Sequence, residues 1–178
     1  MIAVDTNLLV YAHREDSPWH DAAATRIREL AEHRAPWAIP WPGVHEFLAI
    51  VTHPRIFAPP SPLEVAVDQV EAWLEAPSLV LLAEAEGYWP GLRAALVEGR
   101  IAGPLVHDAR VAALCQLHGV RELWTADRDF SRFPGLVARN PLVPGSDMTG
   151  VHFGATGARV PPGLLSRDQT TARDRPSP

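Results

Sequence analysis

Two aspartates follow predicted strands at points where their side chains could share a site. Asp5 comes directly after the apolar run at residues 2–4, and Asp127 comes three residues after Trp124. The carboxyl ends of parallel strands lie at one edge of a sheet, so we expect these carboxylates to meet if their strands are neighbours. Each aspartate could instead be a helix N-cap, whose side chain accepts a hydrogen bond from a backbone N–H.

A third carboxylate, that of Asp108, lies on the apolar face of a predicted helix. Leu105, Val111 and Cys115 recur on the same face at helical spacing. An ionised carboxylate in such surroundings is costly unless a cation or several hydrogen-bond donors compensate its charge. The pattern therefore favours a bound cation, although Asp108 could also cap a helix that begins at Ala109.

Two further acids stand close to these elements. Glu46 lies on a predicted helix beside the apolar face formed by Phe47 and Val51, and in isolation it is typical of a surface glutamate. Asp129 follows Asp127 by two residues. It could be an outer ligand of a metal ion or a solvated charge in the first turn of a helix.

The chemistry of these acids follows from their number. Carboxylates that converge without a basic partner repel one another, which raises their pKa values unless a divalent cation is bound. A site made of Asp5, Glu46, Asp108 and Asp127 offers only oxygen ligands, which suit Mg²⁺ or Mn²⁺ better than zinc. Such an ion can generate hydroxide from water and offset charge on a phosphate, so the acids predict phosphodiester hydrolysis.

The charge and composition of the chain exclude several other classes. All 16 basic residues are arginine, so a P-loop lysine, a Schiff-base lysine and a Ser-Lys nucleophile pair are excluded. The net charge of -5 argues against nucleic-acid binding through a broad basic surface. Cys115 is the single cysteine, which excludes an intrachain disulfide and a cysteine-based zinc site. We expect it to be a small buried residue.

The N-terminal segment reaches Asp5 before any basic residue, so it lacks the positive region that begins a secretory signal. The apolar runs are also much shorter than the roughly 20 residues that span a bilayer. We therefore expect a cytoplasmic protein with no membrane partner.

Short apolar runs alternate with segments of helical period. This alternation predicts an α/β fold in three α/β/α layers, with a parallel sheet covered on both faces. The expected strands are Ile2–Val4, Trp37–Ile39, Ser78–Leu82, Glu122–Trp124 and Leu136–Ala138, and the expected helices include residues 19–33, 44–51, 65–74, 92–97 and 105–115. We expect Gly119 to end the last helix. A length of 178 residues suits one domain, predicted at 1–143, and the Pro- and Gly-rich segment 144–178 is predicted to be a flexible tail.

Four segments of the sequence together resemble the VapC-like toxins of the PIN-domain ribonucleases. These segments, which fall in the family's order over residues 1–142, are IAVDTNLLVYA, PWPGVHEFLAIVTHPRIF, LVHDARVAAL followed by HGV, and ELWTADRDFSRFPGL. The resemblance implies a sheet of about five strands and Mg²⁺- or Mn²⁺-dependent endonucleolytic cleavage of RNA. It also implies a homodimer neutralised by a VapB-type antitoxin, which can place an arginine in the acidic pocket.

The same resemblance implies roles for particular residues. Its acidic quartet matches Asp5, Glu46, Asp108 and Asp127, which we expect to be catalytic and to bind the metal. Asp129 matches the second acid of the closing motif, and it is added to the expected metal ligands. Asn7 and Thr125 are expected to be supporting polar residues beside the quartet.

Other interpretations of the same residues remain open at the level of sequence. His45 and His107 each precede a proposed ligand, so they could be general bases or could lie on outer helix faces. A domain that only binds RNA or a protein is one alternative function. A phosphatase of the haloacid-dehalogenase type is another, although that family needs a second aspartate where this chain has Asn7, and usually a lysine.

Overall fold

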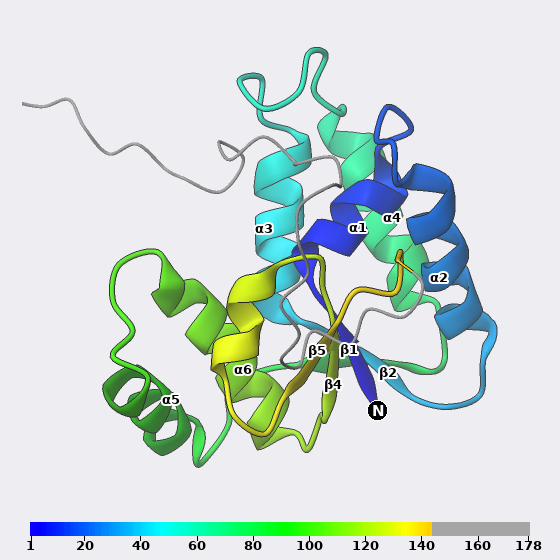
Figure 1. Cartoon of the computed structure of the whole chain (residues 1–178). Coiled ribbons are helices and arrows are strands. Elements are labelled where there is room, and N and C mark those ends of the chain that lie inside the picture. Colours follow the sequence, from blue (N-terminus) through cyan, green and yellow to red (C-terminus); the bar gives the residue numbers. More distant parts are fainter. Residues whose placement is uncertain (144–178) are drawn as a thin grey trace, which may run out of the picture.

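Five parallel strands form a single sheet in the order β3-β2-β1-β4-β5 (Figure 1). The computed structural model describes residues 1–143, so the predicted tail at 144–178 lies outside the described residues. The strands are β1 (Ile2–Val4), β2 (Trp37–Pro40), β3 (Leu79–Leu82), β4 (Glu122–Trp124) and β5 (Val137–Arg139). Strands β2 and β3 lie on one side of β1, and β4 and β5 lie on the other. The site expected at the carboxyl end of β1 is therefore at the topological switch point of the sheet.

Helices cover both faces of the sheet, which confirms the three-layer prediction. The helices are α1 (Thr6–His13), α2 (His20–Glu32), α3 (Trp41–Val51), α4 (Leu63–Leu74), α5 (Tyr88–Glu98), α6 (Leu105–Leu117) and the 3-10 helix η1 (Arg128–Arg132). One core lies between the sheet and α1 to α4, and a second core lies between the sheet, α5, α6 and η1 (Figure 1).

Side chains alternate between these two cores along each strand, as the period of a β-strand requires. In β1, Ala3 faces α6 and Val4 faces α1, and in β2, Ala38 faces α6 while Trp37 and Ile39 face the other core. The small alanines on the α6 side allow that helix to approach the sheet closely. Helix α6 carries Asp108, so this packing determines how near that carboxylate comes to the sheet edge.

All five predicted strands are present, with ends that differ from the predictions by one residue at most. The helix expected over 92–97 is longer, because Gly87 adopts a positive φ of 88° and lets the chain turn into α5 at Tyr88. Gly119, with a φ of 67°, follows the end of α6, and the Val120 N–H donates to the Cys115 carbonyl at 2.8 Å. The predicted stop at this glycine is thus confirmed.

One smaller expectation is confirmed by the position of Cys115. Cys115 is fully buried on the inner side of α6, as predicted for a small apolar residue. Within residues 1–143, the helices are all too short or too polar to cross a membrane.

Phe47 is the central aromatic side chain of the core under α3. It is fully buried, and its ring makes edge contacts with the rings of His13 and Trp73 at centroid distances of 5.2 and 4.8 Å. We predict that Phe47→Ala lowers the free energy of unfolding by about 3–5 kcal/mol, because it leaves a cavity in a packed core. Urea unfolding of the purified variant measures this loss.

Leu63→Ala provides the matched control, since Leu63 is on α4 and 59% exposed. Its expected effect is within about 0.5 kcal/mol. Equal losses for the two variants would contradict the packing described for Phe47.

Candidate metal centre

The two aspartates predicted at strand ends lie side by side because β1 and β4 are neighbours. Val4 is paired with Trp124, and the Asp5 N–H extends this pairing by donating to the Trp124 carbonyl at 2.9 Å. After Asp5 the chain enters α1, and from Thr125 it enters the loop that leads to η1. The polar side chains that follow both strands therefore emerge at one edge of the sheet.

Asp5 is buried, and its carboxylate accepts three hydrogen bonds. Oδ1 accepts the Thr6 N–H at 2.8 Å, while Oδ2 accepts the Asn7 amide at 2.7 Å and the Thr125 hydroxyl at 2.7 Å. Asp5 is therefore the N-cap of α1 and also a member of the acidic site, so the two interpretations of this residue are compatible.

The pKa of Asp5 is raised to about 7, with burial as the largest cause and the negative charges of Glu46 and Asp127 as smaller ones. The hydrogen bonds from Thr125 and Thr6 oppose this rise. A positive charge nearby, such as that of a bound cation, would therefore stabilise the ionised form of Asp5.

Asn7 and Thr125 bind the loop after β4 to the first turn of α1. The Asn7 amide donates to the Thr125 hydroxyl at 3.0 Å, and its carbonyl accepts the Ala126 N–H at 3.1 Å. The Thr125 hydroxyl also accepts the Asp127 N–H at 2.9 Å. Both side chains therefore connect Asp5 and the backbone of Asp127 through hydrogen bonds.

Three aspartates come together on the α6 side of this loop. One carboxylate oxygen from each of Asp108, Asp127 and Asp129 lies within 4.8 Å of the other two. Oxygens that share one Mg²⁺ at about 2.1 Å lie about 3 to 4 Å apart, so a small inward movement would let all three bind one ion. The donor set contains only hard oxygen ligands, and it fits a divalent cation.

Asp127 has a local role as well, because its Oδ1 accepts the Asp129 N–H at 2.8 Å and caps η1. This contact confirms the capping interpretation of Asp127 and holds the Asp129 backbone next to the Asp127 carboxylate. Asp129 thus lies with the other two aspartates.

Asp108 lies inside α6, in its first turn. The alternative that it caps a helix beginning at Ala109 is wrong, because the helix begins four residues earlier, at Leu105. The pKa of Asp108 is raised to about 7: burial is the largest cause, the charges of Asp127, Asp129 and Glu46 contribute to the rise, and Arg132 opposes it. The sequence argument that an isolated charge on this face is costly agrees with this shift.

Arg132 is a charged neighbour of the site that the sequence analysis did not identify. Its Nε and Nη2 both lie 3.1 Å from Asp129 Oδ1, one helical turn away in η1. The i, i+3 spacing within RDFSR was the available signal, but a short 3-10 helix cannot be recognised from periodicity. Arg132 partly neutralises the negative charge of the three aspartates on the side of Asp129.

Glu46 approaches the site from α3. Its Oε2 accepts the Thr6 hydroxyl at 2.8 Å, and its charge raises the pKa of both Asp5 and Asp108. Neither Glu46 nor Asp5 has an oxygen in the close group that Asp108, Asp127 and Asp129 form. The expected ligands thus divide into three that meet and two that border them.

The two histidines that precede proposed ligands lie on outer helix faces. His45 and His107 are both exposed, and the His45 ring stacks on Trp41 at a centroid distance of 5.9 Å.

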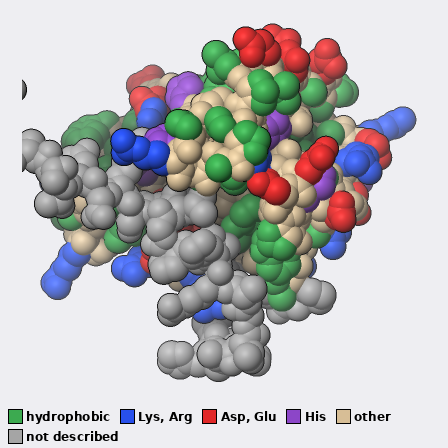
Figure 2. Space-filling model, turned by 90° about the horizontal axis from the view of Figure 1, so that it is seen from above, with side chains coloured by type: hydrophobic (Ala, Val, Ile, Leu, Met, Phe, Trp, Pro, Cys, Tyr) green, Lys and Arg blue, Asp and Glu red, His purple; other side chains and the backbone are tan. Residues whose placement is uncertain are grey.

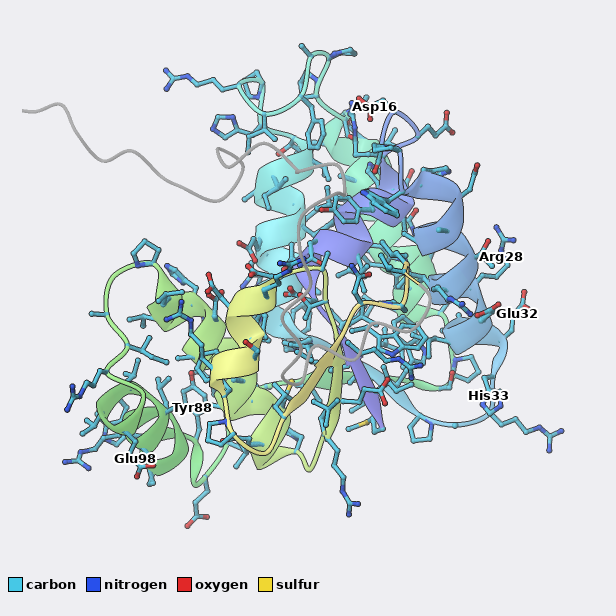
Figure 3. All side chains as sticks on the ribbon, in the orientation of Figure 1. Asp16, Arg28, Glu32, His33, Tyr88 and Glu98 are labelled. Carbon is cyan, nitrogen blue, oxygen red and sulfur yellow. The ribbon has the colours of Figure 1, made fainter. Side chains whose placement is uncertain are left out.

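Figure 3 shows Arg28 and Glu32 pointing outward from α2, and Glu98 on α5, so these charges stand apart from the carboxyl edge of the sheet. In the view from above in Figure 2, basic side chains are scattered over the visible face and do not gather in one patch.

Asp108→Asn tests whether the clustered carboxylates destabilise the metal-free protein. The folded pKa of about 7 exceeds the ordinary value of 3.8, so the stability linked to protonated Asp108 is fully present below about pH 4. It is lost as the pH rises through about 7. We predict that the variant, in EDTA, unfolds a few degrees higher than the parent protein at pH 8, with a smaller difference at pH 5.

Asp68→Asn on the exposed side of α4 is the control for this substitution and should leave the unfolding temperature unchanged. Differential scanning calorimetry at both pH values gives the comparison. A variant that is less stable than the parent at pH 8 would contradict the proposed repulsion.

Comparisons with known proteins agree with this geometry. The model of the PIN domain family matches residues 2–136. Ribonuclease VapC48 of Mycobacterium tuberculosis is 35% identical over 138 residues, which cover 78% of this chain and 95% of that protein. Ribonuclease VapC43 of the same organism is 34% identical over 142 residues, covering 80% of this chain and 96% of that protein.

Solved structures share the fold at lower identity. The VapBC2 complex of Rickettsia felis, bound to a DNA fragment from its promoter, contains a chain with a TM-score of 0.55 and 22% identity, covering 79% of this chain and 98% of that one. VapC20 of Mycobacterium tuberculosis, a toxin that cleaves the sarcin-ricin loop, has a TM-score of 0.53 and 15% identity, covering 74% and 93%. The family model and the relatives that are 34–35% identical exclude the haloacid-dehalogenase alternative, and they show that the chain belongs to the PIN-domain family as a member of the VapC ribonucleases.

Proposed function

We propose that this chain is an endoribonuclease that cleaves RNA phosphodiester bonds with the help of Mg²⁺ or Mn²⁺. The observation that carries the proposal is the group of carboxylate oxygens from Asp108, Asp127 and Asp129, which lie within 4.8 Å of one another. A bare acidic group repels RNA, so binding of a phosphate at this place requires a cation between them.

Each acid of the site would have its own role in such a reaction. Asp108, Asp127 and Asp129 would hold the cation, which when bound lowers the pKa of water and offsets charge on the scissile phosphate. Glu46 keeps its Oε1 for the ion or for a bound water, since Oε2 accepts the Thr6 hydroxyl. Asp5 retains lone pairs beyond its three hydrogen bonds and completes the negative field from the sheet side.

The supporting residues fix these acids before substrate arrives. Asn7 and Thr125 connect the loop after β4 to the start of α1, because each bonds to both segments. Arg132 lies beside Asp129, and its guanidinium would offer hydrogen-bond donors to a phosphate bound at the site. Such a preorganised arrangement lowers the reorganisation needed in the transition state.

RNA cleavage by the purified chain is the direct test of this function. We predict cleavage with added Mg²⁺ or Mn²⁺, no cleavage with EDTA, and a loss of about 100-fold or more in rate for Asp127→Asn. The exposed Asp68→Asn variant should cleave RNA at the parental rate.

Electrophoresis of a labelled RNA after timed incubation gives these rates. If the chain binds RNA but leaves it intact under all metal conditions, the RNA-binding alternative without catalysis replaces this proposal. Parental activity in Asp127→Asn would exclude the acidic group as the catalytic site.

We also propose that the chain is the toxin of a type II toxin–antitoxin system and forms a homodimer bound by a VapB-like antitoxin. Support comes from the VapC ribonucleases that it resembles over most of their length, and from the VapBC2 complex that shares its fold. An acidic group of this kind suits an antitoxin arginine as a substitute cation.

Expression of the chain alone in bacteria should arrest growth, and co-expression of the small protein encoded beside it should restore growth. Counts of viable cells after induction measure both effects, with the Asp127→Asn chain as the harmless control. Normal growth on induction of the parent chain, at equal protein levels, would contradict the toxin assignment and leave the nuclease assignment to the cleavage assay.

A further inference from the structure

Thr6 connects the first turn of α1 to the middle of α3. Its side chain is 4% exposed, and its hydroxyl donates to Glu46 Oε2 at 2.8 Å across 40 residues of sequence. Thr6 is the first residue of α1, so no carbonyl of a preceding helical turn competes for this proton. The hydroxyl is therefore free to bond the carboxylate of Glu46.

Gly43 provides the space for this contact. It is buried on α3, one turn before Glu46 and on the same side of the helix. A Cβ atom at this position would lie 3.3 Å from Thr6 Oγ1, which is closer than most such contacts allow. Glycine is unfavourable inside a helix compared with alanine, so its presence here has a packing reason in the close approach of α1.

The contact restricts a side chain that is otherwise loosely held. Glu46 is an exposed residue, and a glutamate in solvent samples many rotamers. With Oε2 bound to Thr6, its remaining oxygen has a defined position relative to the sheet edge. Thr6 also follows Asp5 directly, so Glu46 is tied to the same turn that Asn7 and Thr125 hold in place.

We propose that Thr6 is a positioning residue for Glu46, which it holds at the border of the Asp108, Asp127 and Asp129 group so that Glu46 contributes to cation binding. This inference rests on the proposed metal-dependent function and adds a residue to it. Gly43 contributes to the same contact, because the absence of a side chain there lets α1 and α3 approach each other at the Thr6 hydroxyl.

Thr6→Val and Thr6→Ser separate the hydroxyl from the shape of the side chain. Valine keeps the volume and removes the donor, whereas serine keeps the donor. We predict that Thr6→Val raises the Mn²⁺ dissociation constant about 10- to 100-fold, as loss of a supporting hydrogen bond to a metal ligand typically does. Thr6→Ser should remain within about threefold of the parent.

Isothermal titration with Mn²⁺ gives the affinities, and circular dichroism checks that each variant is folded. The Mn²⁺ concentration for half-maximal RNA cleavage should shift with the affinity, with most of the rate recovered at saturating Mn²⁺. A purely structural role for Thr6 would lower the unfolding temperature and leave the metal midpoint unchanged, which would overturn the proposal.

Gly43→Ala is an independent test of the same contact between the Thr6 hydroxyl and Glu46. We expect it to weaken Mn²⁺ binding in the parent chain, where the new methyl group displaces Thr6 Oγ1. In a Thr6→Ala background the methyl group has room, so the same change should have little further effect on affinity. Additive effects of the two substitutions would contradict a shared contact.

The outcomes also separate this inference from the function on which it rests. A parent chain that neither binds Mn²⁺ nor cleaves RNA contradicts the proposed function, and this inference falls with it. A parent chain that does both, beside a Thr6→Val variant with unchanged Mn²⁺ affinity and midpoint, contradicts the inference alone.

Discussion

The buried carboxylate of Asp5 requires hydrogen-bond donors, and the arrangement around the site follows from that requirement. Asp5 lies where β1 ends and α1 begins, so one donor is the first backbone N–H of the helix. The other two come from Asn7 and from Thr125, which is 120 residues away in the sequence. This network brings the loop after β4 against α1, and it thereby fixes Asp127 and η1 beside Asp108.

Much of this arrangement was predictable from the sequence, because it depends on strand ends and helix periodicity. The apolar runs before Asp5 and Thr125 predicted two strands whose carboxyl ends would meet, and the sheet places them side by side. Asp108 was predicted on physical grounds, since its apolar helix face makes an isolated charge costly. The folded pKa of about 7 for this carboxyl has burial as its largest cause, which is the same physical reason.

Other features depend on contacts between distant segments, which no local pattern specifies. The bond from Thr6 to Glu46 requires the close packing of α1 on α3 at Gly43, and the pairing of Arg132 with Asp129 requires the short 3-10 turn. The start of α6 at Leu105 agrees with the predicted helix over 105–115, and the helix continues two residues further, to Leu117. The five acids expected as metal ligands therefore divide into a close group of three, which includes Asp129, and two neighbours, Asp5 and Glu46.

The central claim is that Asp108, Asp127 and Asp129 hold the divalent cation on which RNA cleavage depends. Crystals soaked in Mn²⁺ and measured at a wavelength with strong manganese anomalous scattering would locate the ion directly. The account predicts an anomalous peak among the three carboxylates, about 2 to 2.3 Å from an oxygen of each, and its loss in Asp127→Asn. A fully occupied peak elsewhere, with none at this group, would contradict it.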